Sequence, residues 1–455
     1  MKNNNLKNLP SVNKVLLYIK SHISLSDDYL KKIINIEIER IRNEIIENKI
    51  QQNKEKIFLN IANRVLTLTS VRLKNVINGT GIVLHTGFGR APFKSSLLIK
   101  IAKRLEGYVN LEFDLEKGKR GNRQSHIQGY VNAMCGAESS LIVNNNAAAV
   151  MLGINELGKN GEVIVSRGQL VEIGGSFRIP DIIKKSGCIL KEVGTTNRTH
   201  EDDYLNAITD KTSLIIWVHT SNYVIKGFTK SVPLDRLVRI ANKKKIPIMV
   251  DWGSGSLLNM KSLNIANEVK IKEVMRNNPD ILTFSGDKLI GGPQSGLIIG
   301  KKNIIKELQN NPIYRAIRCD KITIGLMEET LRNYKTESFQ KDHLALNLLT
   351  TSRKTLINRG KRILVNQNKQ QIIALGMKIE ESEVQAGSGS LPEDNIESAA
   401  IVFNPKIIKI HNLAKKFRCG TTPVVGYISD DKFYIDLKAI LPNQINALSK
   451  IIAGI

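Results

Sequence analysis

Short apolar runs that alternate with helical segments between residues 138 and 300 constrain the fold more than any other feature of the chain. The runs predict strands at 140–143, 162–166, 188–193, 214–218 and 246–250. Strands that alternate with helices form mostly parallel sheets, which bind ligands outside the carboxyl ends of their strands. We therefore expect an α/β fold with a mostly parallel central sheet and a ligand site in the polar turns after these strands.

The stretch 280–300 holds the most reactive candidate side chain. Two apolar runs flank Ser285-Gly-Asp-Lys288 and a Gly291-Gly-Pro293 turn, which predicts two short strands with a lysine between them. Partial desolvation beside glycines lowers the pKa of such a lysine and frees its amine to attack a carbonyl. Lys288 is thus a candidate Schiff-base residue, and the hydroxyl of Ser285 could bind a phosphate next to it. A solvated surface lysine is the alternative.

Two further features indicate pyridoxal phosphate as the cofactor. Asp251 ends the run 246–250 and lies 37 residues (288 − 251) before Lys288. A buried carboxylate keeps a pyridine nitrogen protonated, which makes this cofactor an electron sink; a cap on the next turn is the other role open to Asp251. The run 140–143 leads into a helix whose free N–H groups and positive dipole end would hold a phosphate. The residues at this turn are Asn144, Asn145, Asn146 and Ala147.

Length and charge indicate several domains and an acidic partner. A chain of 455 residues exceeds the size at which single cores stop growing, and its net charge of +25 suits nucleic acid. A general bias toward Lys, Asn and Ile would give the same charge without any function. Residues 11–70 show helical periodicity and many basic side chains, so they predict a small basic helical module that binds nucleic acid, or simply solvated helix faces. We expect domains at 1–72 (basic, helical), 73–335 (catalytic) and 336–455 (helical arm and smaller α/β domain).

Basic residues at three other places predict anion binding. The glycine-rich loop 78–92 holds His85 and Arg90, and the segment 114–126 is rich in lysine and arginine. Arg315 and Arg318 lie three apart, so on a helix they would share one face and could clamp a single anion.

The cysteines and the N-terminus indicate a cytoplasmic protein. The four cysteines are far apart and form no CxxC pair, which argues against a disulfide framework and a structural zinc site. No signal-peptide core and no membrane-length apolar run is present. We expect no metal and no membrane partner.

Long motifs across the chain resemble those of bacterial L-seryl-tRNA(Sec) selenium transferases, also called selenocysteine synthases. The resemblance runs from about Leu9 to the C-terminus. It is carried by Phe284-Ser-Gly-Asp-Lys-Leu-Ile-Gly-Gly-Pro-Gln294, Arg315-Ala-Ile-Arg318 and the segments 85–92, 114–121, 144–149, 172–180, 194–200 and 420–426.

The resemblance implies a pyridoxal-phosphate enzyme of the aspartate-aminotransferase fold type, in a homodecameric ring of dimers, with an N-terminal domain that grips tRNA(Sec). It implies that Lys288 is the Schiff-base lysine, Asp251 the partner of the pyridine nitrogen, and Asp287 a catalytic neighbour. It further implies that His219 and the turn 144–147 hold the cofactor ring and phosphate. Arginines would hold the selenophosphate donor; these are Arg90, Arg315 and Arg318.

The activity that the resemblance implies converts seryl-tRNA(Sec) to selenocysteinyl-tRNA(Sec). Water is eliminated from the β carbon to give dehydroalanyl-tRNA, to which selenium from selenophosphate then adds. The sequence departs from the family pattern at Gly87, Phe88, Trp252 and Cys319, which are neighbours of the proposed groups. Two other functions stay open: a pyridoxal-phosphate lyase for a small amino acid or amino sugar, and an RNA-binding protein without catalysis.

Overall fold

The computed structural model describes residues 6–47, 53–173, 177–263, 265, 268–336, 339–390 and 395–455. The chain divides into two compact units, Met1–Asn75 and Val76–Ile455. The second predicted boundary, at residue 335, lies inside the second unit. The division into three domains stays a prediction.

The first unit is a small helical bundle. Its helices are α1 (Val12–Lys20), α2 (Asp27–Ile46) and α3 (Lys54–Thr69). The side chains of Ser11 and Asn53 accept hydrogen bonds from the first turns of α1 and α3, which fixes where these helices begin. Apolar side chains at helical spacing fill the core between the helices; among them are Val15, Ile19, Leu30, Ile34, Ile41, Ile57 and Ile61.

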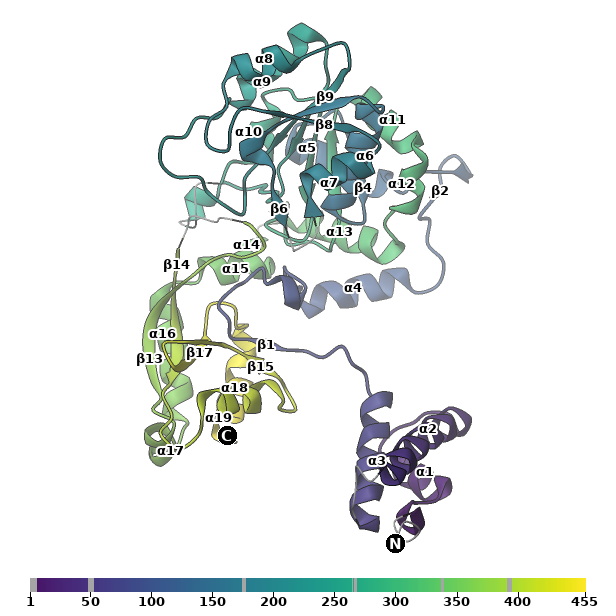
Figure 1. The fold of residues 1–455 in the computed structure, drawn as a ribbon, viewed down its shortest axis with the longest axis vertical. Coiled ribbons are helices and arrows are strands. Elements are labelled where there is room, and N and C mark those ends of the chain that lie inside the picture. Colours follow the sequence, from purple (N-terminus) through teal and green to yellow (C-terminus); the bar gives the residue numbers. More distant parts are fainter. Residues whose placement is uncertain are drawn as a thin grey trace. The chain divides into compact units, whose positions relative to one another are not determined.

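A seven-stranded sheet organises the second unit (Figure 1). Its strand order is β4-β12-β11-β10-β9-β5-β8, and every neighbouring pair is parallel except the two pairs that contain β12. The mostly parallel sheet predicted from the sequence is therefore confirmed. The strands are β4 (Ser139–Val143), β5 (Glu162–Ser166), β8 (Ile189–Val193), β9 (Thr212–Val218), β10 (Ile248–Asp251), β11 (Ile281–Ser285) and β12 (Gly296–Gly300).

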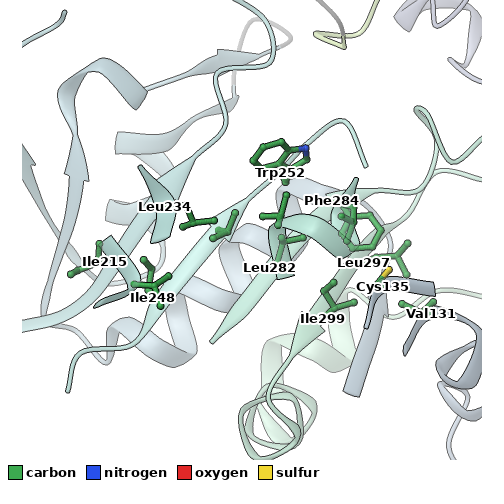
Figure 2. Packing of buried hydrophobic residues seen from close by; sticks show 14 of the residues in the cluster. Val131, Cys135, Ile215, Leu234, Ile248, Trp252, Leu282, Phe284, Leu297 and Ile299 are labelled. Carbon is green, nitrogen blue, oxygen red and sulfur yellow. The ribbon is translucent and has the colours of Figure 1, made fainter. Parts of the chain in front are cut away.

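Helices cover both faces of this sheet, because its strands are apolar on both sides. One face packs against α5 (Ser125–Cys135), α9 (Leu234–Lys244) and α13 (Lys321–Asn333). Figure 2 shows this layer, with Leu282, Phe284 and Leu297 of the sheet beside Val131 and Cys135 of α5. The other face packs against α6 (Asn146–Gly158), α7 (Ile179–Lys185) and α11 (Lys302–Asn310). The carboxyl ends of the parallel strands are thereby held rigidly along one edge.

A second, antiparallel sheet lies in the C-terminal part of this unit. Its order is β13 (Lys378–Val384), β14 (Ile396–Phe403), β17 (Lys432–Asp436) and β16 (Tyr427–Ser429). The helices α16 (Arg353–Val365), α18 (Ile410–Arg418) and α19 (Ile445–Ala453) share its apolar core. The short strand β1 (Ile77–Asn78) pairs in parallel with β15 (Val424–Val425), which ties the start of the unit to its C-terminal part.

Shorter elements complete the unit. They are α4 (Ser95–Leu105), β2 (Phe113–Asp114), β3 (Lys119–Arg120), β6 (Glu172–Ile173), β7 (Phe177–Arg178), α8 (Glu201–Ala207), α10 (Ile271–Met275), α12 (Pro312–Ala316), α14 (Phe339–Asp342), α15 (Leu344–Thr350) and α17 (Lys369–Ala374). Within the described ranges, every helix is too short or too polar to cross a bilayer.

Candidate active site

Lys288 lies just beyond the end of β11 and is buried, with 4% of its surface exposed. Burial, followed by the positive charge of Arg90, lowers the pKa of Lys288 to about 8. A Cβ atom placed on Gly253 would lie 3.5 Å from the Lys288 Nζ, so glycine leaves room beside the amine. The amine is therefore poised to exchange a proton near neutral pH, as a solvated lysine is not.

Asp251 ends β10, the strand beside β11, and is paired in register with Thr283. Its Oδ1 accepts hydrogen bonds from Asn146 Nδ2 (2.9 Å) and Thr283 Oγ1 (3.2 Å). Burial raises the pKa of the Asp251 carboxyl. One donor lies on β11 and the other on α6, so the carboxylate is held by the neighbouring strand and by a helix far away in the sequence.

Neighbouring residues in the turn before α6 make different hydrogen bonds. The Asn145 side chain caps the helix by accepting from the N–H of Ala148 (2.8 Å), and the Asn145 carbonyl accepts from Ala149. The N–H of Asn144 donates to the carbonyl of Ile317 (2.9 Å). The first-turn N–H groups of Asn146 and Ala147 have no carbonyl within the helix to receive them, so they are free to donate to an anion. The sequence did not indicate that the Asn146 side chain would hold Asp251.

His219 follows β9 and belongs to an aromatic stack. Its ring lies parallel to that of Trp252, with centroids 4.0 Å apart and planes 4° apart. Burial, followed by the charge of Lys288, lowers the pKa of His219 to about 4, so the ring is neutral at physiological pH. The His219 Nδ1 is buried and has no hydrogen-bond partner among the described residues.

Glu268 is a member of the site that the sequence analysis missed. Its Oε1 accepts a hydrogen bond from Trp252 Nε1 (3.0 Å) and another from the Ser254 hydroxyl. Burial raises the pKa of its carboxyl, and its charge acts on Lys288. No apolar periodicity or motif surrounds Glu268, so no sequence signal pointed to it.

Arg90 and Asp287 form an ion pair next to Lys288. Arg90 Nη1 lies 2.6 Å from Asp287 Oδ2, and the N–H of Ala91 donates to the Asp287 carbonyl (3.3 Å). The Arg90 Nε is buried without a hydrogen-bond partner in the described part of the chain. Arg90 therefore retains a free donor after it has paired with Asp287.

Arg315 and Arg318 line one cavity of about 490 Å³, although they do not share a helix as expected. Helix α12 ends at Ala316, because Arg318 forms a β-bridge with Val143 instead. Arg318 Nη1 is 2.9 Å from Glu112 Oε1, and its Nε is buried without a partner among the described residues. Arg90 is not part of this cavity lining, so the structure brings together two of the three predicted donor arginines.

Ser285 ends β11 and is buried, and its N–H donates to the carbonyl of Gly253 (3.4 Å). The structure thus places Ser285, Lys288, Asp251, His219 and the α6 start at the carboxyl ends of four strands, β4, β9, β10 and β11. In the ranges that the structure describes, no group of His, Cys, Asp and Glu side chains could hold a metal ion.

Comparisons with known proteins show which proteins this chain resembles. The chain is similar to the L-seryl-tRNA(Sec) selenium transferase of Desulfotalea psychrophila, with 39% identity over 99% of this chain and 98% of that protein. It is likewise 39% identical to the enzyme of the same name from Aquifex aeolicus, over 98% of this chain and 97% of that protein.

A solved structure shares the fold. The structure of D-glucosaminate-6-phosphate ammonia-lyase matches with a TM-score of 0.59 and 18% identity, over 84% of this chain and 96% of that one. Together with the strand order, this confirms the predicted α/β fold of the aspartate-aminotransferase type. The sequence model of one family, L-seryl-tRNA selenium transferase, matches residues 76–441. The chain therefore belongs to the L-seryl-tRNA selenium transferase family.

Proposed function

We propose that this chain converts seryl-tRNA(Sec) to selenocysteinyl-tRNA(Sec), with selenophosphate as the selenium donor and pyridoxal phosphate as the cofactor. Family membership and the names of the relatives support the reaction. The observation that carries the proposal is a buried lysine of lowered pKa, Lys288, beyond the strand next to that of the buried Asp251.

The residues of the site fit pyridoxal phosphate. The N–H groups at the start of α6 suit its phosphate, and Gly253 leaves space beside the Lys288 amine. A protonated pyridine nitrogen would supply the positive partner that the buried carboxylate of Asp251 needs. The neutral His219 ring and Ser285 complete the proposed set of cofactor-binding side chains.

Bound pyridoxal phosphate would supply an electron sink for the carbanion formed at the serine α carbon. The chain's own residues position and transfer protons. Lys288, with a pKa of about 8, can hold a proton at Nζ and release it near neutral pH. Asp287 contacts Arg90 and thereby sets the charge around that amine.

Arg90, Arg315 and Arg318 are available to bind the selenophosphate donor. The carboxyl group of serine is esterified to tRNA, so the substrate presents no free carboxylate for an arginine to neutralise. Arg90 and Arg318 each retain an unpartnered Nε donor among the described residues, and Arg315 is exposed in the cavity with Arg318. Guanidinium groups bind phosphate oxygens through paired donors, which suits selenophosphate.

Exposed basic residues of the first unit, including Lys31 and Lys32 of α2, would bind tRNA(Sec). The protein would assemble as a homo-oligomer, a decamer built as a pentamer of dimers, in the cytoplasm.

Visible absorption of the purified protein tests the proposal. We expect a Schiff-base band that shifts on addition of seryl-tRNA(Sec) and not on addition of seryl-tRNA(Ser) or free serine. A band that responds to small amino compounds and ignores tRNA would favour a lyase, and the absence of a band would favour an RNA-binding protein. Lys288→Ala should abolish the band and the turnover while tRNA binding persists.

A further inference from the structure

A polar cavity of about 320 Å³ is lined by none of the residues of the candidate active site. Its polar side chains come from three segments of the second unit; they are His85, Thr86, Asn222, Gln385, Ser388 and Ser390. None of the lining residues is a lysine, arginine, aspartate or glutamate. The cavity therefore suits an uncharged ligand that both donates and accepts hydrogen bonds.

Two buried polar atoms at this cavity lack partners among the described residues. Ser390 is 2% exposed, and its Oγ has no hydrogen-bond partner. Asn222 is anchored because its Nδ2 donates to the carbonyl of Glu172 (2.7 Å), which leaves its buried Oδ1 unpartnered. Unsatisfied buried polar atoms are costly, and a bound ligand with hydroxyl groups would satisfy both.

His85 adds a donor. Its Nδ1 accepts from the N–H of Gly87 (3.1 Å), and burial lowers the pKa of the ring. A neutral imidazole whose Nδ1 accepts carries its proton on Nε2, so Nε2 can donate to a ligand oxygen.

Two chain segments that line the cavity continue to residues near Lys288. Asn222 follows Ser221, whose Oγ would lie 3.9 Å from a Cβ placed on Gly253, the same position that would lie 3.5 Å from Lys288 Nζ. His85 begins the turn that ends at Arg90, whose N–H donates to the His85 carbonyl (3.0 Å). The Gly387–Ser390 turn is fixed against this segment, because the Ser388 hydroxyl donates to the carbonyl of Leu84.

We infer that this cavity binds the ribose of the terminal nucleoside to which serine is esterified. The inference rests on the proposed function, and it names the part of the substrate that lies next to the reacting amino acid. Beyond the ester bond the substrate carries ribose hydroxyls, which donate and accept but bear no charge. A free amino acid would present a carboxylate at this place, and such a group needs a cation that the lining does not contain.

Calorimetric titration of the full-length, cofactor-loaded protein tests the inference. The probe is the stable amide of L-serine with 3′-amino-3′-deoxyadenosine, and L-serinamide is the reference without a nucleoside. We expect Asn222→Ala and Ser390→Ala each to weaken binding of the probe about 5- to 10-fold, as for a lost hydrogen bond to a buried group. Binding of L-serinamide should be unchanged, and so should probe binding by the control Asn412→Ala, an exposed residue of α18.

The 2′-deoxy form of the probe provides a second arm that does not depend on how well a variant folds. Removal of the hydroxyl should weaken binding to the unmodified protein and have a smaller effect in at least one of the two cavity variants, since each variant has already lost its part of the contact. Equal affinity for both probes in the unmodified protein would overturn the inference. If seryl-tRNA(Sec) is still converted in that case, the proposed function stands without it, whereas binding of free serine with no response to tRNA would overturn both.

Discussion

The imidazole of His219 and the indole of Trp252 lie face to face, with centroids 4.0 Å apart and planes 4° apart. Trp217 extends the stack, and the centroid of its ring lies 5.6 Å from the centroid of the Trp252 ring. The chain contains two tryptophans, so its tryptophan fluorescence comes entirely from this stack. Glu268 holds the indole N–H of Trp252, which fixes the orientation of the rings.

Fluorescence should therefore report the protonation of His219. Because burial lowers the pKa of His219 to about 4 from 6.5, we expect a change in tryptophan emission near pH 4 and none near pH 6.5. The folded protein binds this proton less readily than the unfolded chain, so the contribution of His219 to stability is complete above about pH 6.5 and is lost as the pH falls toward 4. His219→Gln should remove the transition, and circular dichroism over the same range separates it from unfolding. A midpoint near pH 6.5 would show that the ring is solvated.

The pKa of Lys288 should move in opposite directions in two variants. Arg90 lowers this pKa and Asp287 raises it, so we expect Arg90→Ala to shift it upward and Asp287→Asn to shift it downward. The pH dependence of the rate at which pyridoxal phosphate recombines with the cofactor-free protein measures both shifts, because only the unprotonated amine attacks the aldehyde. Shifts in the same direction would contradict the arrangement of these charges.

Some basic residues of α2 should contribute to tRNA binding and another to the stability of the unit. Lys31 and Lys32 are exposed, so Lys31→Glu with Lys32→Glu should weaken tRNA binding and reduce the slope of log K against log salt by roughly 0.9 for each lost phosphate contact. Filter-binding titrations at several salt concentrations measure this slope. An unchanged affinity would mean that tRNA binds another face of the unit.

Arg40 should behave differently from these lysines. Arg40 Nε lies 2.7 Å from Glu37 Oε2, and Glu37 is only 3% exposed. Arg40→Glu would therefore leave a buried carboxylate without its main partner and place a second negative charge beside it. We expect a lower melting temperature for this variant, whatever its effect on tRNA, and an unchanged melting temperature would contradict the structural role.

The strands of the central sheet were predictable because their apolar runs are short and separated by polar turns. The predicted run 162–166 coincides with β5, and the other strands differ by a few residues at their ends. Strand-end polar residues could likewise be assigned to one edge, since parallel strands bring their carboxyl ends together. Lys288 and Asp251 follow from this rule.

Contacts between segments far apart in the chain were not predictable in the same way. The side chain of Asn146 reaches Asp251, which lies 105 residues later, and no local pattern encodes that bond. Arg318 lies outside the helix that holds Arg315, because it forms a β-bridge with Val143 at the end of β4. The three-residue spacing would have put both arginines on one face only if the helix had continued to Arg318. Glu268 accepts a hydrogen bond from Trp252, and the sequence around it has no apolar periodicity. Tertiary pairing decides all three, and the sequence displays only local preference.

Gly296 should couple the stability of the sheet to cofactor binding. A Cβ at this position would lie 2.2 Å from the carbonyl oxygen of Asn145, a backbone atom at the start of α6. Gly296→Ala must therefore displace β12 or the helix start that presents the N–H groups of Asn146 and Ala147. We expect a lower melting temperature and weaker retention of pyridoxal phosphate, measured by thermal unfolding and by dialysis against cofactor-free buffer.

Two variants serve as controls for Gly296→Ala. Gly426→Ala would clash with the carbonyl of Tyr434 at 2.0 Å, so it should lower the melting temperature and leave cofactor retention unchanged; Gly129→Ala in α5 meets open space and should be neutral or stabilising. Equal cofactor retention in Gly296→Ala and Gly426→Ala would show that the helix start does not hold the cofactor phosphate.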